Sequence, residues 1–280
     1  MIIEIIKFLF LSGLIVIISK YFLVTLLRKL GEVLNLKPNT IGNVAGIATS
    51  VPELLTISIS SLSGLMDASI FNVLSSNIIN FIQYFTAIIL NNNKKEIKNK
   101  GILTDLILVV FTIIIPIILI ILNIQVNLLL VPVFILFLFG FYYISGNAHK
   151  LYLSKQEKEM EYEIEREKRW ERGNKRKAKK YTIYLIIVAI LLFIVGNALG
   201  NTLENLCNYF GVPQVLVGIF LGFVTSIPEL ITFFESQKHH KKINDSMIGV
   251  VEATNNLLTS NIMNLFVIQS IGIILYSIVL

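Results

Sequence analysis

Long apolar runs alternate with short polar breaks along the whole chain. Because a bilayer core is crossed by about 20 apolar residues of helix, the runs that are long enough predict eight membrane spans, at 4–28, 41–63, 67–90, 102–122, 127–147, 181–208, 212–235 and 245–280. The breaks are rich in Pro, Gly and Asn, which interrupt helices. The pattern therefore predicts an all-α polytopic membrane protein with about eight spans.

Composition supports a membrane protein and excludes several other classes. Only 15% of the 280 residues are charged and the mean hydropathy is +0.75, whereas a soluble domain has about 25% charged residues. The sequence has no nucleophile and base pair, phosphate loop or nucleotide fingerprint, so we expect neither an enzyme nor a cofactor. The net charge of +6 comes without an aromatic-interleaved basic face, which argues against nucleic acid as a partner.

The charged residues gather in one segment, 149–180, which holds 12 Lys/Arg and 7 Glu. We interpret it as a cytoplasmic linker between a first membrane repeat, 1–148, and a second, 181–280. With this linker in the cytoplasm, 22 of the 24 Lys/Arg lie on that side, as the positive-inside rule requires, and both termini lie outside. Abundant Ile, Asn and Lys are typical of an AT-rich prokaryote, which predicts the plasma (inner) membrane.

Two pairs of segments repeat within the chain. Residues 46–56 (GIATSVPELLT) and 222–232 (GFVTSIPELIT) are identical at seven of eleven positions, and 71–80 and 255–264 at six of ten. Five predicted spans separate equivalent points, so the two copies cross the bilayer in opposite directions. Inverted repeats with interrupted helices are how many secondary transporters place a site near the midplane, so we expect an inverted repeat of helix bundles.

A proline followed by a glutamate stands at the centre of each first motif. Proline lacks the N–H of a helix and clashes with the carbonyl four residues back, so the helix should open there and expose backbone oxygens, including those of Thr49 and Thr225. A carboxylate within the bilayer is costly, which marks Glu53 and Glu229 as functional candidates.

Hydroxyl groups lie beside both carboxylates. Ser50 and Ser226 come three residues before the glutamates, on the same helical face. Such an all-oxygen set suits Ca²⁺ or Na⁺ better than zinc or copper. The Thr and Ser hydroxyls have an alternative, which is to bond their own helix backbone.

The second motifs add Ser/Asn pairs four residues apart, Ser76 with Asn80 and Ser260 with Asn264. We interpret these as ligands or near-ligands, although such residues also hold membrane helices together by hydrogen bonds. That packing role is the one expected of four further asparagines: Asn72, Asn77, Asn256 and Asn261. Glu252 is expected at an access path or a solvated end, and His239-His240 in a solvated loop.

At these residues the sequence resembles the sodium/calcium exchanger family of the cation/Ca²⁺ antiporter superfamily, in which Thr-Ser-x-Pro-Glu and Ser-Asn-x-x-Asn/Asp helices occur twice. The resemblance implies Ca²⁺/Na⁺ (or H⁺) antiport by alternating access, with the first and sixth spans sliding past the core. It implies Ca²⁺ between Glu53 and Glu229 with the carbonyls of Thr49 and Thr225. It implies Na⁺ sites at Ser50, Ser226, Ser76, Ser260, Asn80 and Asn264.

The sequence departs from that family in three ways. The family has ten spans, whereas eight (5 + 3) are predicted here, so the second repeat is expected to be shortened and to need lipid, a second copy or a partner on one flank. Asn264 stands where many members have Asp, so two carboxylates balance one Ca²⁺, or two Na⁺ or H⁺. Ser75 and Thr259 replace a glycine.

These departures keep two alternatives open. The first is a degenerate or partner-dependent membrane subunit that binds cations without transport on its own. The second is an antiporter for another cation, such as K⁺ or Mg²⁺.

Overall fold

The structure, a computed structural model, describes residues 2–34, 36–62, 64–122, 124, 126–152, 175–211, 213–242 and 246–279. Every regular element in these ranges is helical. In chain order they are α1 (Ile2–Ile17), η1 (Ile18–Leu23), α2 (Val24–Leu34), α3 (Pro38–Thr49), α4 (Val51–Leu62), α5 (Met66–Leu90), η2 (Glu96–Lys98), α6 (Lys100–Ile121), α7 (Leu130–Tyr152), α9 (Lys175–Phe210), α10 (Gln214–Thr225), α11 (Ile227–Lys242), α12 (Ser246–Ile262), η3 (Met263–Ile268) and α13 (Gln269–Val279).

Helices occupy the positions of all eight predicted spans. Seven stretches of the described chain are long and apolar enough to cross a membrane, which confirms the multi-pass membrane class. They correspond to the second through eighth predicted spans. The predicted first span lies in α1, η1 and α2, which follow one another without a break.

Two of the spans are interrupted where the sequence predicts it. α3 ends at Thr49 and α10 at Thr225, and the next residues, Ser50 and Ser226, leave helical geometry with ψ of 2° and 4°. Pro52 and Pro228 follow two residues later and supply no N–H to the preceding turn. The prediction of an opened helix at each Thr-Ser-x-Pro-Glu motif is confirmed.

The interrupted helices form the centre of the bundle because glycines let them approach their neighbours. A Cβ at Gly46, on α3, would lie 2.7 Å from the backbone oxygen of Asn256 on α12. In the same way, a Cβ at Gly222, on α10, would lie 2.8 Å from the backbone oxygen of Asn72 on α5. Contacts this close leave no room for a side chain, so α3 packs on α12 and α10 packs on α5.

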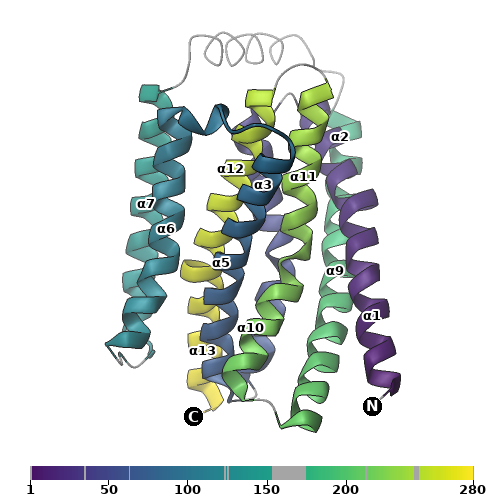
Figure 1. The fold of residues 1–280 in the computed structure, drawn as a ribbon, viewed down its shortest axis with the longest axis vertical. Helices are drawn as coiled ribbons and strands as arrows, with labels where there is room; N and C mark the ends of the chain where they lie inside the picture. Colours follow the sequence, from purple (N-terminus) through teal and green to yellow (C-terminus); the bar gives the residue numbers. More distant parts are fainter. Residues whose placement is uncertain are drawn as a thin grey trace.

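Two helix pairs flank this centre. α6 and α7 stand together on one side, and α1 and α9 on the other (Figure 1). The α1–α9 side has its own buried apolar cluster, which includes Ile15, Leu192 and Leu199. The large cluster around Phe233, Leu257 and Phe266 joins the centre to α6 and α7.

The predicted linker falls mostly outside the described residues. α7 continues to Tyr152 and α9 begins at Lys175, so helix extends into both ends of the segment 149–180. Residues 153–174 lie outside the described residues.

Candidate cation-binding site

The ten side chains singled out in the two repeats are all buried, none being more than 2% exposed. They come from the two helix breaks and from α5, α12 and η3, which pack against those breaks. Residues that are up to 215 positions apart in the sequence therefore meet in the interior of the bundle: Thr49, Ser50, Glu53, Ser76, Asn80, Thr225, Ser226, Glu229, Ser260 and Asn264.

Ser260 is the point at which three of these groups meet. Its Oγ donates to Oε1 of Glu229 at 3.0 Å, and it lies 3.0 Å from Oγ of Ser50. Nδ2 of Asn80 donates to the same hydroxyl at 3.3 Å. Ser50, at the helix break of the first copy, is thus linked through Ser260 to Glu229 of the second copy.

Several oxygens of the site have no hydrogen-bond partner although they are buried. Both carboxylate oxygens of Glu53 and Oε2 of Glu229 are in this state, as is Oγ of Ser226. The side-chain oxygens of Asn80 and Asn264 are also buried and unpartnered. Buried acceptors without donors are rare and costly.

Neither carboxylate takes part in an ion pair within the described part of the chain. A buried carboxylate that lacks a cationic partner must be neutralised by a proton or a bound cation. Glu53 and Glu229 lie close enough to interact electrostatically with each other. The arrangement combines two carboxylates with neutral oxygens, the ligand type that hard cations prefer.

Some hydroxyls of the motifs bond their own helices, as the alternative interpretation allowed. Thr49 donates to the carbonyl of Gly46 at 3.3 Å and Thr225 to that of Leu221 at 3.0 Å. Ser76 donates to Oδ1 of Asn72 on its own helix, α5, and also to the carbonyl of Gly222 on α10. A hydroxyl that donates in this way still has lone pairs for a cation, so these bonds are compatible with a ligand role.

The asparagines expected to pack do hold helices together. Nδ2 of Asn72 donates to Oγ1 of Thr56 at 2.8 Å, and Nδ2 of Asn256 donates to Oγ1 of Thr232 at 2.6 Å. Each bond fastens a second-motif helix to the helix that carries a motif glutamate.

A second asparagine pair joins the two copies to each other. Asn77 and Asn261 each donate to the backbone oxygen of the other, at 3.3 and 3.2 Å. Asn77 also donates to the carbonyl of Thr112 at 3.4 Å. That carbonyl lacks a helical donor because the residue four positions later is Pro116. Pro116, which lies inside the predicted span 102–122, was the sequence signal for this contact.

Two expectations about charged groups were wrong or incomplete. His240, predicted in a solvated loop, lies in α11, and its Nε2 is 3.1 Å from Oε2 of Glu252, with both side chains largely buried. The reason is that Gly249 brings α12 against α11, where a Cβ would lie 2.9 Å from Cα of Gln237. Sequence reasoning also missed Asp105, a fully buried acid that accepts a 2.7 Å hydrogen bond from Ser145.

Comparisons with known proteins agree with this architecture. Solved structures of the sodium-calcium exchanger NCX_Mj are similar to the chain. The one soaked with 100 mM Na⁺ and 10 mM Sr²⁺ has 19% sequence identity and a TM-score of 0.62, over 98% of this chain and 83% of that chain. Another, soaked with 2.5 mM Na⁺ and 0.1 mM Ca²⁺, has 20% identity and a TM-score of 0.61, with coverage of 98% and 83%. At this identity the likeness establishes the fold.

No curated protein matches the chain. The sequence model of the sodium/calcium exchanger protein family matches residues 5–145 and 180–280, which include both copies of both motifs. These ranges cover most of the sequence. The chain therefore belongs to the sodium/calcium exchanger family.

Proposed function

We propose that the chain is a secondary active antiporter that exchanges Ca²⁺ for Na⁺ or H⁺ across the membrane. The cation site is formed by Glu53 and Glu229 together with the surrounding Thr, Ser and Asn oxygens. Family membership supports cation/Ca²⁺ exchange, and the transporter class supports the expectation that the chain is not an enzyme.

One observation carries the proposal. Two buried carboxylates share a site with no cation of the described chain to neutralise them, and three of their four oxygens have no hydrogen-bond donor. Carboxylates inside a membrane bundle mark ion pathways. Two negative charges balance one Ca²⁺, or two Na⁺ or two H⁺, so the proposed exchange transfers one Ca²⁺ against two monovalent ions.

The same proposal includes eight spans arranged as an inverted repeat, with the linker in the cytoplasm and both termini outside. Support comes from the sequence offsets of 176 and 184 residues and from the matched packing of α3 on α12 and α10 on α5. In such an arrangement the two halves can exchange roles, so the site opens to one side of the membrane and then to the other. We assign the sliding elements to the first and sixth spans, which lie in α1–α2 and α9.

The test is ion flux in proteoliposomes that contain the purified full chain. We expect ⁴⁵Ca²⁺ uptake driven by an outward Na⁺ or H⁺ gradient, and the gradient that supports uptake identifies the counter-ion. Glu53→Gln and Glu229→Gln should each reduce gradient-driven uptake to the level of empty liposomes, because each removes half of the charge that balances Ca²⁺ while keeping side-chain volume.

Glu4→Gln is a matched control, because Glu4 is a partly exposed acid paired with Lys7 at the start of α1. It should transport as the unmodified chain does. Gradient-driven uptake that survives both motif substitutions would contradict the proposed site. Calcium binding without flux in the unmodified chain would instead favour a subunit that needs a partner, and K⁺ or Mg²⁺ competition would reveal a different transported cation.

A further inference from the structure

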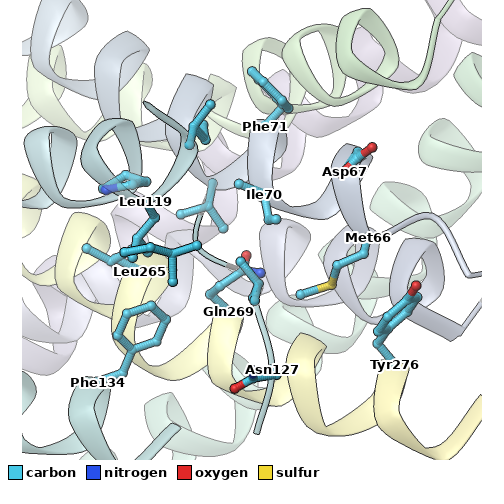
Figure 2. A pocket seen from close by; sticks show the side chains of 15 residues that line it. Met66, Asp67, Ile70, Phe71, Leu119, Asn127, Phe134, Leu265, Gln269 and Tyr276 are labelled. Atoms are coloured by element: carbon cyan, nitrogen blue, oxygen red, sulfur yellow. The ribbon is translucent and has the colours of Figure 1, made fainter. Parts of the chain in front are cut away.

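A cavity of about 550 Å³ lies between α6–α7 and the α5–α13 part of the centre, and neither Glu53 nor Glu229 lines it. Figure 2 shows the side chains that line it. Most are apolar, among them Ile70, Pro116, Leu119, Phe134 and Leu265. Its volume falls within the range of about 300–1,000 Å³ that is usual for small-molecule sites, which are apolar with a few placed polar groups.

The polar group inside this cavity is the amide of Gln269. The side chain is only 4% exposed, and neither its Oε1 nor its Nε2 has a hydrogen-bond partner. In Figure 2 it lies among the apolar side chains of the lining. An unmade hydrogen bond at a buried group costs more than a made one contributes, so a donor and an acceptor that stay free together indicate a missing partner.

Polar residues also mark where the cavity meets the outside of the bundle. Asp67, in the first turn of α5, and Asn127, in the α6–α7 connection, both line the cavity and are exposed. Tyr276 lines it near the end of α13. The site thus runs from a polar mouth, at the end of the bundle that carries the C-terminus (Figure 1), past apolar walls to one amide.

We propose that this cavity binds a single-chain amphiphile whose neutral head group both donates and accepts a hydrogen bond, such as a long-chain alcohol or a protonated fatty acid. The head group pairs with Oε1 and Nε2 of Gln269, and the chain lies against the apolar side chains between α6 and α13. An ester or ether head is a poorer match because it only accepts and leaves Oε1 unpaired. A charged head is excluded because nothing on the lining neutralises it at the depth of Gln269.

The experiment uses the purified full chain in nanodiscs with a long-chain alcohol that carries a photoactivatable diazirine. After irradiation, peptide mass spectrometry locates the labelled residues. We expect labelling concentrated in 66–73, 116–127 and 265–276, and expect unlabelled long-chain alcohol to compete. The methyl ether of the same alcohol, which has lost its donor, should compete about tenfold less well.

Gln269→Leu keeps the shape of the cavity and removes both hydrogen-bonding groups, so it should reduce labelling of these segments by about tenfold. Phe223→Leu is the matched control, because Phe223 is an exposed apolar side chain on α10, outside the cavity. The Glu53→Gln/Glu229→Gln double variant should label as the unmodified chain does, so the result does not depend on ion exchange. Labelling spread evenly over all exposed helices, or unchanged in Gln269→Leu, would overturn the proposal.

Discussion

The two copies of the repeat share their framework but differ in the hydrogen bonds of the residues that form the candidate cation site. The framework bonds match: Thr56 with Asn72 corresponds to Thr232 with Asn256, at 2.8 and 2.6 Å. The close helix approaches at Gly46 and Gly222 match as well. Each copy therefore uses the same residues to fasten its broken helix.

The site oxygens do not match. Glu229 accepts a hydrogen bond from Ser260, whereas neither oxygen of Glu53 has a partner. Ser76, the counterpart of Ser260, donates instead to Oδ1 of Asn72 and to the carbonyl of Gly222 in the other copy. Ser50 is joined to Ser260, but Ser226 has no partner. These unequal hydrogen bonds fit the proposed alternating access, in which the site opens to one side of the membrane at a time.

The helices that carry the second motifs also differ. α5 is a regular α-helix through Asn80, whereas the chain becomes π-helical at Met263–Ile268, which includes Asn264. π-helical turns are rare and are frequent at functional sites. Asn264 of the second copy therefore lies on π-helical backbone, whereas its counterpart Asn80 lies on α-helical backbone.

The largest effect is expected from the matched glycines. Gly46→Ala and Gly222→Ala should each destabilise the fold by about 3 kcal/mol, the upper part of the usual overpacking range, because the new methyl meets backbone atoms at 2.7–2.8 Å. Thermal unfolding in detergent measures this. Gly140→Ala, where nothing lies within 4 Å, should not destabilise the fold, because alanine favours a helix interior over glycine. Tolerance of alanine at only one of Gly46 and Gly222 would mean that the frameworks are not equivalent.

The next largest effect is expected at Ser260, which should contribute more to Ca²⁺ binding than its counterpart Ser76. Ser260→Ala should weaken Ca²⁺ affinity by about 10- to 100-fold, the usual result of removing a group that orients a ligand, since Ser260 joins Ser50, Glu229 and Asn80. Ser76→Ala should weaken it less. Isothermal titration with Ca²⁺ measures both, and equal losses would show that the asymmetry of the hydrogen bonds has no bearing on binding.

Asn72 and Asn256 test the feature in which the two copies are alike, namely the bond from each asparagine to a threonine. Asn72→Ala and Asn256→Ala should each destabilise the protein by about 1–2 kcal/mol, because each breaks a matched bond to a threonine. The loss should be slightly larger for Asn72→Ala, because Asn72 also accepts a hydrogen bond from Ser76 whereas Oδ1 of Asn256 has no partner. Thermal unfolding of the two variants side by side gives the difference. A gap of more than about 1 kcal/mol would mean that the two halves are fastened differently.

The smallest effect concerns a pair that exists in the second copy alone. Glu252 corresponds to Ala68 at the repeat offset of 184, so Glu252→Ala makes the second copy more like the first. Loss of its bond to His240 should cost about 1 kcal/mol of stability. Uptake of ⁴⁵Ca²⁺ should change less than about twofold, because the pair lies outside the proposed site, and a larger loss would place Glu252 on the transport path.

The helices and their interruptions were predictable because they depend on local chemistry. Apolar runs of sufficient length and the prolines at positions 52 and 228 act on their own segments, and the structure breaks both helices as expected. His240 was mispredicted for the opposite reason. Its burial depends on how closely α11 and α12 approach at Gly249, and a run of polar residues does not report such an approach.

The sequence by itself determined the membrane class, the positions of the helices, both broken motifs and the ten side chains that the fold buries together. It did so because the cost of placing polar groups in a bilayer restricts where they occur. Only the tertiary structure decided which oxygens are already bonded, that Ser260 joins the two copies, and that Gln269 stands unpartnered in a cavity. Those outcomes depend on distances between residues far apart in the chain, and such distances are set by packing of the whole bundle.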